Sequence, residues 1–180
     1  MNTTQWLKRF LVSGAAALAL CGAGVAAAAF DMFLKADGIP GESSDDRHKG
    51  EIDILSFSWD ISPKTGDLTG RTARVCAHDL AFVKNIDKAS PLLISSAIVG
   101  TIIPTATLTL RKAGGTPQEF FVIVLTTVTV SSVSHSVDGG SSSLLEQFTL
   151  NFASATVSFR PLKADGSLDT PIVATVARTC

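Results

Sequence analysis

The sequence predicts a mainly β domain that folds as a compact barrel or sandwich, with one short α-helix packed at one side or end. Apolar and polar residues alternate in several short segments rich in Thr, Val, Ser, Phe and Ile, as they do in half-buried strands. Glycines and Asp-Gly pairs interrupt these segments at short intervals. A single segment carries both the start and the stop signals of a helix.

The N-terminal segment, residues 1–29, is typical of a secretory signal peptide. The basic residues Lys8 and Arg9 precede an uncharged, largely apolar run over residues 10–25, and four alanines at 26–29 supply the small residues of a cleavage site. A retained membrane anchor is the alternative, because a spanning helix needs about 20 apolar residues. The many glycines and alanines favour cleavage, since they make the run only weakly hydrophobic.

Cleavage after Ala29 leaves residues 30–180 as one domain, which is long enough to bury a hydrophobic core. We therefore expect an exported protein, periplasmic or secreted, that keeps no membrane contact after cleavage. Losing Lys8 and Arg9 changes the formal net charge from −1 to −3. A nucleic-acid partner is not expected, because it would require a basic face.

Two cysteines, Cys76 and Cys180, remain after cleavage. In an oxidising compartment an even pair is a disulfide candidate. The alternative is one buried core thiol and one thiol in the C-terminal tail. The sequence leaves both open, because it does not give the distance between the two residues.

The clearest strand covers residues 105–110, where small or apolar residues face one side and threonines face the other. Residues 148–152 and 157–160 alternate in the same way. Between residues 51 and 61 the apolar phase shifts near Ile54 and Leu55, which predicts a β-bulge there.

One helix is expected from Ser90, which would cap its N-terminus, with Pro91 at the first helical position. Gly100 is well placed to end it. Turns or loops are expected at several Gly-rich and polar stretches. These are residues 37–38, 62–70, 113–115, 138–143 and 165–166.

Residues 120–125 form a strand that is apolar on both faces. Such a strand is covered on both sides, either within the domain or by another subunit. The second possibility makes Phe120, Phe121, Val122, Ile123 and Val124 candidate subunit-interface residues.

The most charged segment would offer Asp45, Asp46, His48 and Glu51 to a metal. Two basic residues lie among them, and the spacing matches no standard metal motif. We expect a solvated loop leading into a strand, with no metal or other cofactor.

His78 and Asp79 could in principle serve a serine nucleophile. However, the chain has no nucleophile signature, and neighbouring residues in a strand point to opposite faces. It also has no phosphate-binding glycine loop. We therefore expect a protein that is not an enzyme and has no catalytic residues.

With these segments identified, residues 31–176 resemble the haemolysin-coregulated protein (Hcp) family, the tube subunits of bacterial type VI secretion systems. The resemblance rests on segments in a fixed order. They are residues 31–43, 48–54, 82–84, 87–92, 106–115, 130–134, 148–153 and 161–166. It implies a barrel-like fold of two antiparallel sheets with one short helix. It also implies non-enzymatic homo-hexameric rings that stack into a tube, engage secretion-system components and carry small effectors.

Two features depart from the family pattern. Family members usually begin near the segment that corresponds to residue 31, without a signal peptide, and the loop after Trp59 is shorter here. An alternative hypothesis follows: an exported binding module that has kept the fold without forming the tube.

Overall fold

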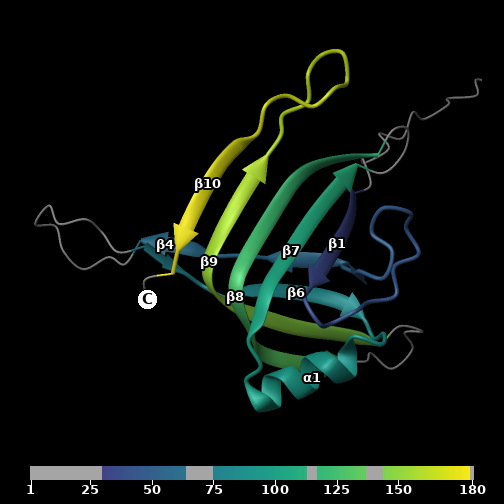
Figure 1. Cartoon of the computed structure of the whole chain (residues 1–180), viewed down its shortest axis with the longest axis vertical. Coiled ribbons are helices and arrows are strands. Elements are labelled where there is room, and N and C mark those ends of the chain that lie inside the picture. The colour runs from purple at the N-terminus through teal and green to yellow at the C-terminus, as the bar shows by residue number, and fades with distance from the viewer. Residues whose placement is uncertain (1–29, 64–74, 113–116, 137–143, 179–180) are drawn as a thin grey trace, which may run out of the picture.

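A computed structural model describes residues 30–63, 75–112, 117–136 and 144–178 (Figure 1). The described part is mainly β with one short helix, as the sequence predicts. Eight strands form one curled antiparallel sheet in the order β2-β1-β7-β8-β9-β6-β3, with β10 also paired to β9. A two-stranded ribbon, β4-β5, makes a second, much smaller sheet.

The strand bounds follow the chain order. They are β1 Phe30–Ala36, β2 Ile52–Asp53, β3 Ser56–Ser58, β4 Ile61–Pro63, β5 Val75–Ala77, β6 Leu80–Asn85, β7 Ile103–Lys112, β8 Gln118–Ser136, β9 Leu145–Phe159 and β10 Ile172–Ala177. The helix α1 spans Ser90–Val99 between β6 and β7. The predicted strands over 105–110 and 148–152 are confirmed within β7 and β9, and the one over 157–160 is confirmed as far as Phe159, where β9 ends.

The sheet closes into a barrel where the chain passes from β2 to β3. The Ile54 amide donates to the carbonyl of Met32 in β1, and the next amide, Leu55, donates to Val83 in β6. These partners belong to strands on opposite sides of the sheet order. The apolar phase shift seen in the sequence is therefore a change of pairing partner, and the explanation as a bulge within one ladder is wrong.

The long strands β8 and β9 bend sharply at Thr127, a β-branched residue with a φ of 50°. Before the bend Ile123 and Leu125 are buried, and after it Val128 and Val130 are buried, so the inward-facing phase changes. All four belong to one hydrophobic core. The bend thus allows the pair β8 and β9 to line two parts of the same core.

Helix α1 begins and ends near the predicted residues, but Ser90 does not cap it. The N-cap residue is Ala89, and its side chain makes no capping hydrogen bond. The Asp87 side chain instead accepts a hydrogen bond from the Ala89 amide. Pro91 lies in the first turn, and Gly100 ends the helix with a φ of 72°, as expected.

The turns at Gly38 and Gly166 are confirmed, and both glycines have positive φ. The loop predicted from residue 62 starts later than expected, because β4 continues to Pro63. Residues 64–70, 113–115 and 138–143 lie outside the described residues. So do the side chain of Cys76 and all of Cys180, and the disulfide remains a prediction.

Candidate assembly surfaces

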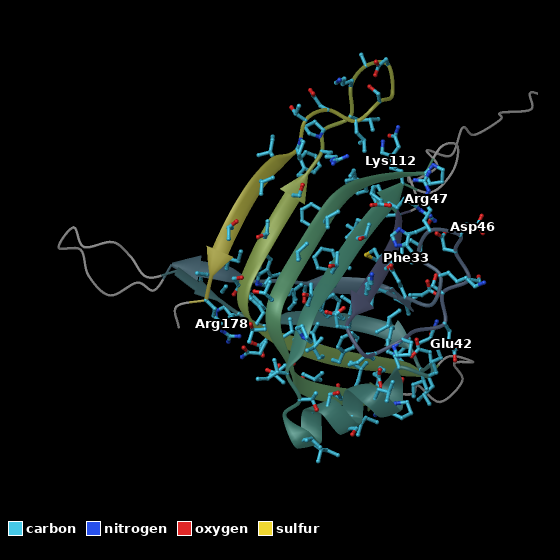
Figure 2. The ribbon with its side chains drawn as sticks, viewed as in Figure 1. Phe33, Glu42, Asp46, Arg47, Lys112 and Arg178 are labelled. Atoms are coloured by element: carbon cyan, nitrogen blue, oxygen red, sulfur yellow. The ribbon has the colours of Figure 1, made fainter. Side chains whose placement is uncertain are left out.

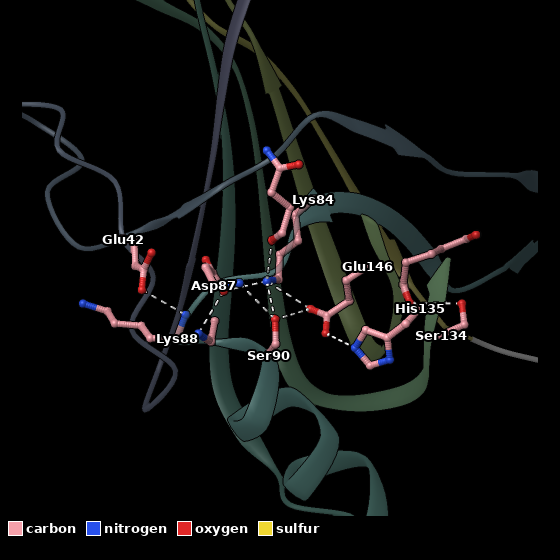
Figure 3. Close-up of polar contacts among 11 residues, drawn as sticks. Glu42, Lys84, Asp87, Lys88, Ser90, Ser134, His135 and Glu146 are labelled. Carbon is pink, nitrogen blue, oxygen red and sulfur yellow. Dashed lines mark hydrogen bonds and ion pairs between the residues drawn. The ribbon is translucent and has the colours of Figure 1, made fainter. Parts of the chain in front are cut away.

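A buried polar network fixes α1 to the barrel (Figure 3). Lys84 of β6 lies opposite Glu146 of β9, and neither residue is accessible to solvent. The Lys84 ammonium is 3.0 Å from the Glu146 carboxylate and also pairs with Asp87. It donates to the Ser90 hydroxyl, which in turn donates to Glu146. Ser90 therefore holds the first turn of α1 against two strands instead of capping it.

The network reaches the surface through His135 of β8. The second carboxylate oxygen of Glu146 lies 2.8 Å from the His135 ring, which is partly exposed. Both Lys84 and Glu146 point inward in phase with the core residues of their strands. Sequence reasoning missed this network, although that shared phase was a usable signal.

A second polar cluster fastens the loop over residues 37–51 to the barrel. Arg111 of β7 pairs with Asp31 of β1 at 2.8 Å and with Asp45 of the loop at 2.7 Å. The hydrogen bond from Arg111, followed by the amide of Arg47, lowers the pKa of Asp45 to about 2. The two carboxylates raise the pKa of Arg111. Asp45 is thus a charged anchor of the loop.

His48 completes this attachment. Its buried ring stacks on Phe33 with centroids 4.2 Å apart, and one nitrogen contacts Glu51 at 2.9 Å. The other nitrogen has no hydrogen-bond partner in the described part of the chain and lies 3.6 Å from Glu119. In Figure 2, Phe33, Asp46 and Arg47 lie on one side of the molecule.

The four residues weighed as metal ligands are not gathered at one point. Asp45 binds Arg111, His48 binds Glu51, and Asp46 is exposed. Within the described residues no group of three or more His, Cys, Asp or Glu side chains could hold a metal. The expected solvated loop is wrong for His48, because that side chain is buried under the loop.

His78 and Asp79 are engaged with different partners. The His78 ring contacts the Ser62 hydroxyl at 3.3 Å, whereas Asp79 accepts from Ser131 and pairs with Arg178 at 2.7 Å. No histidine stands between this carboxylate and a serine, so the pair does not form a relay. Asp79 instead fixes the end of β10.

Exposed apolar side chains gather at two places, α1 and the β9–β10 hairpin. Of the helix residues only Ser90 and Leu93 are buried. We define the helix patch as the exposed apolar residues of α1 and its C-terminal extension: Leu92, Ile94, Ile98, Val99 and Ile102. On the hairpin, Phe159, Ile172 and Val173 are exposed.

The predicted interface residues lie in the first part of β8. Ile123 is buried in the core, whereas Phe120, Phe121, Val122 and Val124 are each only half-buried. The strand is therefore not completely covered within one chain. Whether a second subunit covers it stays a prediction.

Comparison with known proteins identifies the family. Residues 33–159 match the family described as type VI secretion system effector, Hcp. The chain belongs to the Hcp family. It is therefore a non-enzymatic tube or secreted protein of type VI secretion, and the expectation that it is not an enzyme is confirmed.

Individual relatives cover nearly all of the described fold. Protein hcp1 of Pseudomonas aeruginosa is 44% identical over 145 residues, spanning 78% of this chain and 90% of that protein. The crystal structure of Hcp1 from Salmonella typhimurium has a TM-score of 0.69 at 35% identity, covering 83% of this chain and 95% of its own. A type VI secretion system effector from Yersinia pestis has a TM-score of 0.68 at 32% identity, covering 82% and 99%. The barrel-like fold class is thereby confirmed.

The match to the family model begins at residue 33, so the N-terminal segment lies outside that match. Across the ranges that the structure describes, no helix has the length and apolar character needed to cross a membrane.

Proposed function

We propose that this Hcp-family protein forms homo-hexameric rings that carry or bind small effector proteins of type VI secretion. The observation that carries the proposal is the exposed edge of β10. In the described part of the chain β10 pairs only with β9, and Ile172 and Val173 on it are 66% and 56% exposed. An apolar strand with unpaired backbone groups is a site of uncontrolled association unless another chain covers it. Ring closure between identical subunits covers every such edge.

The half-buried outer residues of β8 support the same proposal. Val122 and Val124 lie opposite Ser158 and Thr156 of β9 on one face, which is uncharged at these four positions. Phe120 lies at the end of this face, where its carbonyl accepts from the amide of Arg160. Subunit interfaces are depleted in charged residues at their centre. A neighbouring subunit is a suitable cover for such a surface.

Light scattering coupled to size-exclusion chromatography tests the ring. A mass of six subunits that persists on dilution is the expected result. A monomer at high protein concentration would contradict the proposal and favour an exported binding module that has kept the Hcp fold. The predicted export signal and the short loop after Trp59 motivate that second possibility.

We also propose that residues 1–29 direct export and are removed. N-terminal sequencing of the protein purified from its own cell, with the compartment recorded, tests this. A mature chain that begins at Phe30 outside the cytoplasm is expected. Intact Met1 in the cytoplasm would contradict it, and would leave the ring proposal standing.

A further inference from the structure

An open hollow lies between the turn that follows β1 and the last part of the loop over residues 37–51. Residues 35–40 line one side of it, and Arg47, Lys49, Gly50 and Glu51 line the other. Its volume is about 450 Å³, within the range of roughly 300–1,000 Å³ that small-molecule sites occupy. None of the lining residues belongs to α1, β8, β9 or β10, which carry the proposed assembly surfaces.

Three cationic side chains at this hollow have no carboxylate partner within the residues that the structure describes. Lys35, Arg47 and Lys49 are exposed, and none of them takes part in an ion pair there. Arg47 has one long polar contact, with the carbonyl oxygen of Pro117 at 3.5 Å. By contrast, Arg111 under the same loop is paired with two carboxylates. The three unpaired cations make the hollow suitable for an anion.

The two carboxylates that line the hollow are fewer and less exposed than the cations. Glu51 turns one oxygen to the buried His48 ring at 2.9 Å, and its side chain is only 17% exposed. Asp37 is exposed. A phosphate monoester presents three terminal oxygens, one for each cation, and a charge of about −1.5 to −2 at neutral pH. A carboxylate presents two oxygens and one charge, so it matches this set of cations less well.

The contact that attaches the loop also gathers the cations. Lys35 lies two residues after Phe33 in β1, so the two side chains point to the same face. His48 stacks on Phe33 with ring centroids 4.2 Å apart. Its chain neighbours Arg47 and Lys49 are therefore held on the same side of β1 as Lys35.

The backbone of the loop is fixed on both sides of Arg47. Before it, Asp45 pairs with Arg111 at 2.7 Å. After it, the Gly50 amide donates to the carbonyl of Ser43 at 2.8 Å. A preorganised site binds more tightly, because less conformational entropy is lost on binding.

We propose that this hollow binds a phosphate group carried by a small organic molecule. The two lysines and Arg47 bind the phosphate oxygens, and the guanidinium group supplies two parallel hydrogen-bond donors. Ala36, Ile39 and Pro40 line the rest of that side of the hollow and contact the organic part. The inference does not depend on the proposed ring, because all of the lining residues come from one chain.

Isothermal titration calorimetry of the full chain with AMP tests the site. AMP should bind, whereas adenosine, which lacks the phosphate, should give no measurable binding. Ribose 5-phosphate should also bind, and inorganic phosphate should bind more weakly than AMP. Raising the salt concentration should weaken AMP binding, because the cations are exposed.

Charge variants locate the site. Lys49→Glu should weaken AMP binding about tenfold or more, because a repulsive charge replaces an attractive one beside the phosphate. The matched control is Lys163→Glu, which lies outside the hollow and makes the same change in net charge. It should alter AMP binding less than about twofold. Asp37→Asn should tighten AMP binding about two- to threefold, since it removes a carboxylate from the lining. A loss of folding would not produce this gain.

Adenosine binding as tightly as AMP would overturn the proposal, and so would equal losses in Lys49→Glu and Lys163→Glu. Inorganic phosphate binding as tightly as AMP would overturn the assignment to an organic phosphate. A neighbouring copy is the competing occupant of the hollow. If AMP binds the monomer but not the hexamer identified by light scattering, the hollow belongs to an interface between copies and the proposal is wrong.

Discussion

Replacing Lys84 by methionine should be among the most destabilising conservative changes in the barrel. Methionine fills a similar volume but leaves Glu146 as a buried charge, with Ser90 and His135 as its remaining side-chain hydrogen-bond partners in the described part of the chain. Breaking a fully buried ion pair by removing one partner costs about 3–5 kcal/mol, because the remaining charge is uncompensated. Glu146→Gln should cost less, about 1–3 kcal/mol, since Lys84 keeps its pairing with Asp87.

Urea unfolding followed by circular dichroism measures these costs as shifts of the midpoint at constant slope. All variants are compared at one protein concentration, because assembly adds to apparent stability. The matched control is Lys163→Met, which removes an ion pair 3.8 Å long between two half-exposed side chains. It should cost less than about 1 kcal/mol.

The double variant Lys84→Met, Glu146→Leu provides an internal check. Removing both charges leaves Asp87 and His135, which both reach solvent. The double variant should therefore cost less than the sum of the single changes, with a coupling of about 0.5–3 kcal/mol. A Lys84→Met variant no less stable than the Lys163→Met control would refute this account of the network.

Three further changes probe the backbone and the loop. Gly41→Ala should destabilise the domain by about 1–3 kcal/mol or more in urea, because its Cβ would collide with the backbone of Glu51. Thr127→Gly should be neutral or raise the midpoint, since it relieves a φ of 50° in a β-branched residue, and a clear loss would contradict strain at the bend. Asp45 has a folded pKa of about 2 against an ordinary value of 3.8, so its contribution is present above pH 3.8 and is lost as the pH falls toward 2. Urea midpoints measured across this range should fall more steeply for the native protein than for Asp45→Asn.

The fold class, the helix and most strands could be predicted because each depends on local pattern. The partner change between Ile54 and Leu55 could not, because alternation reports which side chains face inward and not which strand lies alongside. The bend at Thr127 was also hidden, since a threonine gives no sign of positive φ. In both places the inward-facing phase changes along the chain, and the cause of the change is tertiary.

The site residues divide in the same way. Lys84 and Glu146 each share the inward phase of an apolar strand, so the sequence indicates that two opposite charges point into the core. It does not indicate that they meet, because their pairing joins residues 62 positions apart through the register of β6 on β9. Asp45 and His48 were weighed as metal ligands and then assigned to a solvated loop, so their part in attaching that loop to the barrel was not predicted. Their partners, Arg111 and Phe33, lie on strands distant in sequence.

The buried network attaches the inner side of α1 to the barrel, whereas the helix patch lies on the outer side of α1. Substitutions can therefore separate a role in stability from a role in assembly. The buried hydrogen bond from Lys84 to Ser90 fixes the start of α1 to the barrel. At the other end of the helix, Ile98 and Val99 are apolar and exposed. Ile98→Asp should therefore abolish ring formation with little change in the urea midpoint of the monomer. Lys84→Met should lower the midpoint, and should weaken the ring only as far as it displaces the helix. An Ile98→Asp variant that remains hexameric at micromolar concentration would show that the helix serves the barrel alone.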